Sequence, residues 1–348
     1  MIHQLVHTLN YGDAISGETL ALQRIFRARG IESDIYAINT HPKYQGLTKD
    51  YRDFNRGFMG EVILHYSLGS PLNELYRNLP LAKRTMIYHN LTPAKWFQGI
   101  NPRIVADIEA GLAELPELLK ISDKIIADSK FNAGELKAYG VDAAVLGLSF
   151  DPVRWDIPRN EGFYNLLKQE GGIHVLHVGR IAPNKCLEDI IKAFYFLHHK
   201  IDKRSRLWLP GIDIDTELYS FSLKRMVHEF QLTGVVEFCG GRSDDELKAL
   251  YEAASVYVCM SEHEGFCLPV IEAMNFNLPV IGYHASALPE TIGDGGIIVH
   301  DKDPHKLAEL MYQVSTDLSL RRQLIERGLD RVKDFTFKVF HDEVNLLI

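Results

Sequence analysis

The chain has 348 residues, of which 46% are hydrophobic and 24% charged, a composition typical of globular proteins with large cores. Its length predicts two domains, and no apolar run of about 18 residues occurs, so no transmembrane helix is expected. The formal net charge of −8 argues against general nucleic-acid binding.

The N-terminal run Met1–Leu9 lacks the cationic region of a signal peptide and predicts a strand. The four cysteines form no C-x-x-C pair, which argues against a zinc site or disulfide framework and favours a reducing cytosol. Residues 1–165 carry 18 Lys and Arg against 19 Asp and Glu, whereas residues 166–348 carry 20 against 27. The nearly neutral first half is compatible with peripheral contact with an anionic membrane.

Apolar runs alternate with amphipathic helical segments in the first half, which predicts a parallel sheet with crossover helices. The expected elements are a helix over Ser16–Arg29 and strands over Met1–Leu9, Ser33–Ile38, Val62–His65, Met86–His89, Lys124–Asp128 and Ala144–Leu148. The segment 149–172, rich in proline, glycine and charge, breaks the alternation and is expected to be a linker.

The alternation then restarts. The expected strands are His174–Val178, Leu207–Pro210, Val235–Cys239, Val256–Met260 and Val280–Tyr283, and the helices are Leu187–His198, Glu217–Leu232, Ser243–Ala253 and two beginning near Leu268 and Pro304. Two such units predict two Rossmann-like, doubly wound α/β domains facing a cleft, with ligands beyond the carboxyl ends of the strands. We expect an acceptor-side domain over 1–165, a nucleotide-sugar domain over 166–330, and a helical segment over 331–348 packing back toward the first.

The segment S-E-H-E-G-F-C-L-P-V-I-E-A-M, residues 261–274, follows an expected strand. Gly265 allows a tight loop, and Pro269 suits the first turn of a helix whose N-terminus attracts a diphosphate. Glu264 and Glu272 can accept hydrogen bonds from hydroxyls at two points of a ligand, one a sugar and one a ribose. Alternatively, Glu264 caps the helix and Glu272 is solvated surface.

This segment resembles the E-x7-E signature of the retaining glycosyltransferases of family 4, which have the GT-B fold. The segments N-L-P-V-I (277–281) and L-P-E-T-I-G-D-G-G (288–296) follow in the family's order and spacing. The family commonly has Gly at the positions of Cys267 and Asn277, which leaves the local backbone geometry open. The resemblance implies a catalytic role for Glu264 and donor contacts from Gly265, Phe266, Cys267, Leu268 and Glu272.

A second loop, H-V-G-R-I-A-P-N-K-C over residues 177–186, follows the first strand of the second domain. Gly179 permits a turn, and Arg180 and Lys185 offer a rigid fork and a compact charge to a leaving diphosphate. A solvated loop is the alternative. The family places its diphosphate-binding Arg and Lys at the matching positions, which implies that role here.

In the first half, the loop 10–18 contains Gly12, which lets the backbone approach a substrate. The family often places this loop near the donor phosphates and the acceptor, which implies donor contacts from Gly12 and Asp13; alternatively, Asp13 is only a turn residue. Ser16 is a candidate helix cap. The loop is not G-x-G-x-x-G, so NAD is disfavoured. His89 in Y-H-N-L-T-P is either structural or, as in family members, close to the transferred sugar.

The turn Gly240-Gly241-Arg242 matches the one that borders the nucleobase in the family, and residues 127–132 resemble its strand-end serine segment, with a structural or acceptor-side role. No histidine, aspartate or glutamate cluster has metal spacing. Asp213-Ile214-Asp215 spells D-x-D but follows a strand-Pro-Gly turn. We therefore expect no metal and no cofactor.

With the resemblance, these residues predict a metal-independent, hexosyltransferase-type enzyme. It would move a sugar from a nucleotide-diphosphate sugar to a carbohydrate or lipid-linked acceptor in glycan or cell-envelope polysaccharide synthesis. The expected location is the cytoplasm, with or without membrane association. The alternatives are another GT-B enzyme, such as a nucleotide-sugar epimerase or a phosphorylase, and a non-catalytic nucleotide-sugar-binding protein.

Overall fold

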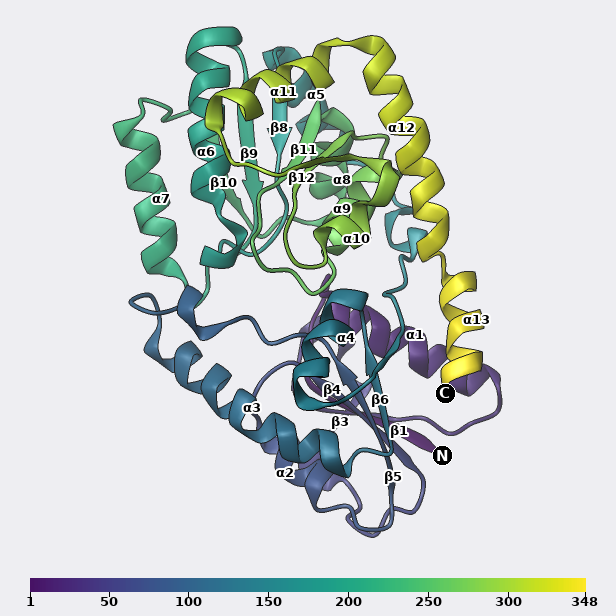
Figure 1. Cartoon of the computed structure of the whole chain (residues 1–348). Coiled ribbons are helices and arrows are strands. Elements are labelled where there is room, and N and C mark those ends of the chain that lie inside the picture. The colour runs from purple at the N-terminus through teal and green to yellow at the C-terminus, as the bar shows by residue number, and fades with distance from the viewer. The chain divides into compact units, whose positions relative to one another are not determined.

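The computed structural model describes residues 1–348 as two compact units, each built on its own parallel sheet (Figure 1). Unit 1 comprises residues 1–98, 102–149 and 335–348, and unit 2 comprises residues 99–101 and 150–334. The prediction of two Rossmann-like α/β domains is confirmed. None of the helices combines the length and hydropathy that a membrane span requires.

Unit 1 has a seven-stranded sheet in the order β3-β2-β1-β4-β5-β6-β7, with every neighbouring pair parallel. The strand order reverses at β1, so the crevice in which such sheets bind ligands lies at the carboxyl ends of β1 and β4. The strands are β1 (Ile2–Leu9), β2 (Ile35–Thr40), β3 (Thr48–Asp50), β4 (Glu61–Tyr66), β5 (Lys83–Tyr88), β6 (Lys124–Ala127) and β7 (Ala144–Val145).

Helices cover both faces of this sheet because successive strand residues point to opposite faces. Ile63 and Ile87 pack with Phe26 of α1 and Phe340 of α13, whereas Leu64 packs on the other face with α2 and α3. Helix α13 lies beside α1, although nearly the whole chain separates them (Figure 1). The helices are α1 (Ala14–Ala28), α2 (Pro71–Arg77), α3 (Pro102–Ile121), α4 (Lys130–Leu136) and α13 (Phe337–Leu347).

Unit 2 has a six-stranded parallel sheet in the order β10-β9-β8-β11-β12-β13. Its order reverses at β8, so the loops that follow β8 and β11 emerge at the topological switch point. The strands are β8 (His174–Leu176), β9 (Arg206–Pro210), β10 (Val236–Gly240), β11 (Val256–Cys259), β12 (Val280–Tyr283) and β13 (Ile297–Val299).

A large apolar core fixes this second sheet between its helices. Val175, Val258 and Ile281 of the central strands pack with buried residues of α6 and α11. The helices are α5 (Glu161–Glu170), α6 (Leu187–Phe196), α7 (Glu217–Glu229), α8 (Asp244–Ala253), α9 (Leu268–Asn275), α10 (Leu288–Ile292), α11 (Pro304–Thr316) and α12 (Leu318–Val332).

The expected linker over 149–172 is wrong. This stretch contains α5, capped by Asn160, and the buried Trp155, whose ring centroid lies 5.8 Å from Tyr251 and 5.1 Å from Phe276. The main segment of unit 2 therefore begins at residue 150, earlier than the expected 166. The prolines and glycines here mark turns around a short helix, and tertiary contacts such as the packing of Trp155 and the Arg159–Glu252 ion pair show to which core the segment belongs.

Candidate functional site

An ion pair joins the loops that follow β8 and β11 in unit 2. The ammonium of Lys185 donates to both carboxylate oxygens of Glu264, at 2.7 and 2.6 Å, and the two side chains are 19% and 8% exposed. Burial opposes both charges, but their attraction outweighs it, so the pKa of Glu264 is lowered and that of Lys185 is raised. Both groups are therefore charged at neutral pH.

Hydrogen bonds to the backbone hold these two loops in register. The amide of Asn184 donates to the carbonyl of His263 at 2.9 Å, and the N–H of Glu262 donates to the carbonyl of Asn184 at 2.9 Å. The N–H of Glu264 donates to the Ser286 hydroxyl at 2.8 Å, which ties in the loop after β12. The alternative that Glu264 caps α9 is wrong, because Cys267 occupies the cap position and Lys185 engages the Glu264 carboxylate.

The turn expected to hold a diphosphate is built on close backbone contact. A Cβ on Gly211 would lie 1.7 Å from the carbonyl oxygen of Gly179, so only glycine fits there. Gly211 in turn donates its N–H to the carbonyl of Gly240, at 2.9 Å. The half-buried Arg180 donates from Nη2 to the carbonyl of Ile214 at 2.8 Å, which fixes its side chain.

The turn expected to border the nucleobase lies next to this contact through Gly240, whose φ is +65°. Gly241 follows it, and Arg242 forms an ion pair with Glu246 at 3.3 Å. The backbones of Gly179, Gly211 and Gly240 therefore lie in sequence across the carboxyl ends of β8, β9 and β10.

The structure resolves the local backbone that the sequence leaves open. Cys267 and Asn277 adopt φ values of +78° and +57°, in the left-handed region that favours glycine. Residues other than glycine thus adopt the left-handed backbone at both positions, with some strain at Cys267. Gly265, the buried Phe266 and Cys267 lead into α9, which begins at Leu268.

Glu272 is 4% exposed, so the alternative that it is solvated surface is wrong. Its carboxylate accepts hydrogen bonds from the Tyr251 hydroxyl at 2.7 Å and from Arg154 Nη1 at 3.1 Å. Arg154 also donates to Asp244 at 2.9 Å. Burial raises the pKa of Glu272, and the attraction of Arg154 acts against that rise.

Two residues of this cluster were missed in the sequence analysis. Arg154 lies in the segment interpreted as a linker, and Tyr251 lies in α8, whose apolar period predicts a core residue. No spacing rule relates either to Glu272.

His177 is a further missed residue, although it opens the second motif. Its Nδ1 donates to the carbonyl of Val258 at 2.9 Å, and its Nε2 is buried without a partner. Burial lowers the pKa of His177 to about 4. The ring is therefore neutral at pH 7, with a free lone pair on Nε2.

Residues 159–331 match the family model described as "Glycosyl transferases group 1". The chain carries a group 1 glycosyltransferase domain. This match includes Arg180, Lys185, Glu264 and Glu272, whereas Arg154 lies outside it.

Curated relatives cover the same region. The chain is 29% identical over 167 residues to O-antigen chain mannosyltransferase B of Escherichia coli, covering 47% of this chain and 42% of that protein. It is 27% identical over 223 residues to D-inositol 3-phosphate glycosyltransferase of Streptomyces bingchenggensis, covering 60% and 48%. The chain thus spans less than half the length of these relatives.

Solved structures extend the likeness beyond the group 1 domain. Sucrose-phosphate synthase from Thermosynechococcus elongatus aligns with a TM-score of 0.77 at 19% identity, covering 99% of this chain and 97% of that one. HepE of Anabaena, in complex with UDP and glucose, aligns with a TM-score of 0.77 at 14% identity, covering 99% and 98%. At these identities the likeness establishes the GT-B fold.

In unit 1, Asp13 rather than Ser16 caps α1, which begins at Ala14. The Asp13 carboxylate accepts from the N–H and the hydroxyl of Ser16, at 2.9 and 2.8 Å. Gly12 has a φ of +75°, as a tight turn before a helix requires. One oxygen of Asp13 is thus used structurally, and the donor contact expected of Asp13 stays a prediction.

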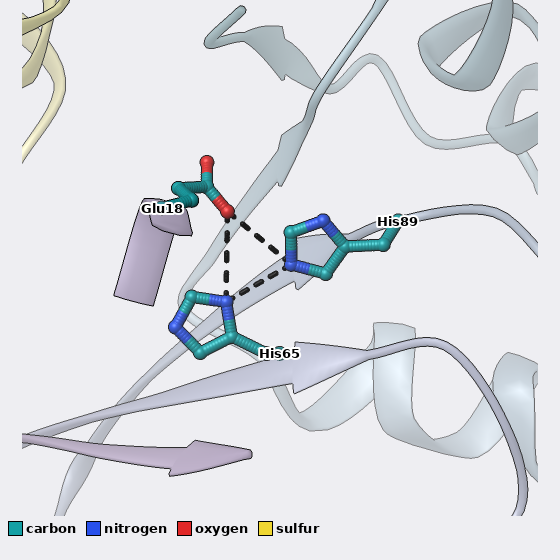
Figure 2. A group of neighbouring side chains, drawn as sticks. All are labelled: Glu18, His65 and His89. Carbon is teal, nitrogen blue, oxygen red and sulfur yellow. Dashed lines mark hydrogen bonds and ion pairs between the residues drawn. The ribbon is translucent and has the colours of Figure 1, made fainter. Parts of the chain in front are cut away.

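His89, which directly follows β5, lies in a buried cluster with His65 of β4 and Glu18 of α1 (Figure 2). Its Nε2 is 2.9 Å from His65 Nδ1 and 3.4 Å from Glu18 Oε2. Its Nδ1 is 3.4 Å from Asp128 Oδ2. Contact between His89 and a sugar would have to displace one of these partners, so we leave His89 out of the catalytic set proposed below.

The serine segment after β6 is structural in this geometry. Ser129 caps α4 by accepting from the N–H of Asn132 at 3.1 Å, and Asn132 donates to Asp128. In the D-x-D sequence at residues 213–215, Asp213 forms an ion pair with the ammonium of Lys224, at 3.7 Å.

Proposed function

We propose that this protein is a nucleotide-sugar-dependent glycosyltransferase of the retaining family 4 type. The observation that carries the proposal is the buried Lys185–Glu264 ion pair, which lies within the group 1 domain and is formed by the loops after β8 and β11. Those loops emerge at the switch point, where open α/β sheets bind their ligands. The GT-B fold supports the same activity.

The leaving diphosphate would be stabilised by protein charges. Lys185 has three N–H donors, two of which bond to Glu264. The third can reach a phosphate oxygen, and Arg180 and the amides at the start of α9 supply further positive potential. We propose that these groups replace a divalent cation at the diphosphate.

Glu264 and Glu272 would contact different parts of the donor. Glu264 lies in the loop, where the reacting sugar can approach the backbone, and we assign it a catalytic role. Glu272 lies one turn inside α9, and its remaining lone pairs would accept from the ribose. Arg154 and Tyr251 would hold that carboxylate in place.

We propose a carbohydrate or lipid-linked acceptor in glycan or cell-envelope polysaccharide synthesis. The support is that relatives include O-antigen chain mannosyltransferase B and serotype-specific mannosyltransferase WbdA of Escherichia coli. The absence of disulfide pairing among the four cysteines supports a cytoplasmic location, and peripheral membrane contact is part of the proposal.

The proposal is tested by thermal unfolding in the presence of UDP-, GDP- and ADP-sugars. A ligand at about 100 times its dissociation constant adds about 2.7 kcal/mol of stability. The stabilising donor is then incubated with candidate acceptors. A transferase releases nucleoside diphosphate only when an acceptor is present, an epimerase converts the donor without releasing it, and a non-catalytic protein does neither.

A further inference from the structure

Three side chains of types that bind metal ions converge within unit 1, outside the residues of the group 1 domain. Glu18 Oε2 lies 3.6 Å from His65 Nδ1 and 3.4 Å from His89 Nε2, and the two ring nitrogens are 2.9 Å apart. Figure 2 shows that the carboxylate oxygen and both ring nitrogens point at one another. The side chains of His65 and Glu18 are 0% exposed and that of His89 is 1% exposed.

The ring nitrogens that face away from the cluster, His65 Nε2 and His89 Nδ1, each face a hydrogen-bond acceptor and so carry a proton. The amide of Gln4 donates to the carbonyl of Thr19 at 3.0 Å, so its Oε1 faces His65 and accepts from Nε2 at 2.9 Å. His89 Nδ1 faces the Asp128 carboxylate, which can only accept. When both rings are neutral, the inner nitrogens, His65 Nδ1 and His89 Nε2, present lone pairs to each other and to the Glu18 carboxylate.

Such a site is incomplete without a cation. Neither oxygen of Glu18 accepts a hydrogen bond, although the residue is 2% exposed. A buried carboxylate without a donor costs several kcal/mol, and lone pairs at hydrogen-bond distance repel one another. A metal ion among the three donor atoms would neutralise the carboxylate and use every lone pair.

We propose that Glu18, His65 and His89 bind a divalent transition-metal ion. Metal–ligand bonds of about 2.1 Å place neighbouring donor atoms about 3.0 Å apart at 90° and about 3.4 Å apart at the tetrahedral angle. The observed separations of 2.9, 3.4 and 3.6 Å bracket those values. Two imidazoles and one carboxylate suit zinc or iron, and Glu18 Oε1 can supply a fourth donor atom.

The surroundings are those of a metal centre. Metal-bound histidines commonly donate their other N–H to a carboxylate or carbonyl, which fixes the tautomer; His89 faces Asp128 and His65 faces Gln4 in this way. The ion would join α1, β4 and the end of β5 and so hold the loop containing Gly12 and Asp13. Its role is structural and separate from the proposed donor chemistry of unit 2.

The test is the metal content of the full-length protein, purified without a histidine tag and measured by elemental analysis. We expect about one equivalent of transition metal per chain, and refolding with Co²⁺ should give visible d–d absorption. Glu18→Gln and His65→Asn should lower the metal content at least five-fold. The control His7→Gln changes a histidine of β1 outside the cluster and should keep the parent's content.

Two results would overturn the proposal. One is a parent protein that contains no metal as purified and gains no d–d bands with Co²⁺, which would leave a shared proton as the cation between the rings. The other is metal that is retained in Glu18→Gln but lost in Cys267→Ser, which would place it at the Cys259, Glu264 and Cys267 group of unit 2. The metal content and Co²⁺ spectrum of the parent protein decide whether a metal ion is bound, even if the variants fail to fold. Donor binding is measured in a separate assay, so the proposed function is tested independently.

Discussion

Lys185 and Glu264 are 79 residues apart in the chain, yet one ammonium donates to both oxygens of one carboxylate. The pair brings the cation expected at the diphosphate into direct contact with the carboxylate expected at the sugar. In the proposed function, one buried ion pair would therefore interact both with the charge that develops on the leaving diphosphate and with the charge on the reacting sugar.

Removing either cation should impair the leaving-group step. We expect Lys185→Ala and Arg180→Ala each to lower turnover about 100-fold or more, the effect of losing one preorganised charge-stabilising group. The measurement is kcat under saturating donor, with the unfolding temperature recorded alongside. Arg225→Ala, which removes a 67% exposed side chain, should leave turnover unchanged. Near-normal kcat in Lys185→Ala or Arg180→Ala would remove that residue from the proposed role.

Substitution of Glu264 and of Glu272 should affect different steps of the reaction. Glu264→Gln should mainly lower kcat, because contacts to the reacting sugar strengthen in the transition state. Glu272→Gln should mainly weaken binding of the bare nucleoside diphosphate, because ribose contacts change little during the reaction. It should also cost about 1–3 kcal/mol of stability, because Arg154 and Tyr251 lose a charged acceptor. Calorimetric affinity for the bare nucleotide separates the variants, and the opposite pattern would reverse the assignment.

Donor binding should not need a divalent cation. In the proposed function Arg180 and Lys185 would supply the charge that Mg²⁺ or Mn²⁺ supplies elsewhere, so calorimetry should give the same nucleoside diphosphate affinity with either ion or after brief EDTA treatment. EDTA is added just before measurement, so that an ion buried in unit 1 is not removed. A large loss of affinity restored by Mg²⁺ or Mn²⁺ would contradict metal independence, with Asp213 and Asp215 the first candidates.

His177 should make the protein sensitive to mild acid. Because burial lowers the pKa of His177 to about 4, below the unfolded value of about 6.5, the unfolded chain binds more protons between these limits. The contribution of neutral His177 to the free energy of unfolding is complete above about pH 6.5 and falls by about 1.4 kcal/mol per pH unit toward pH 4. His177→Asn, which retains a donor toward Val258, should flatten denaturant-derived stability across this range, whereas His228→Gln at an exposed position should not. Equal slopes in all three proteins would refute the assignment.

Asn277 offers a test of backbone strain outside the reaction. It occupies the C′ position of α9, where its own N–H donates to Met274 O and the N–H of Leu278 donates to Ala273 O, at 3.1 and 3.0 Å. At φ +57°, Asn277→Ala should be less stable than Asn277→Gly by about 1 kcal/mol. That difference is about 2–4 °C in unfolding temperature for a domain of this size. Equal stabilities would mean that the turn relaxes.

The sequence by itself determined the two α/β units, because alternating apolar strands and amphipathic helices are local patterns with one low-energy arrangement. It also identified the loops after β8 and β11, since Gly179, Arg180, Lys185, Glu264 and Glu272 lie within short contiguous motifs. The tertiary structure decided which distant side chains meet. Arg154 reaches Glu272 because Trp155 packs on Tyr251 and Phe276, and His65 reaches His89 because β4 and β5 pair in parallel register. Contacts of this kind depend on packing between elements, which no spacing within one segment encodes.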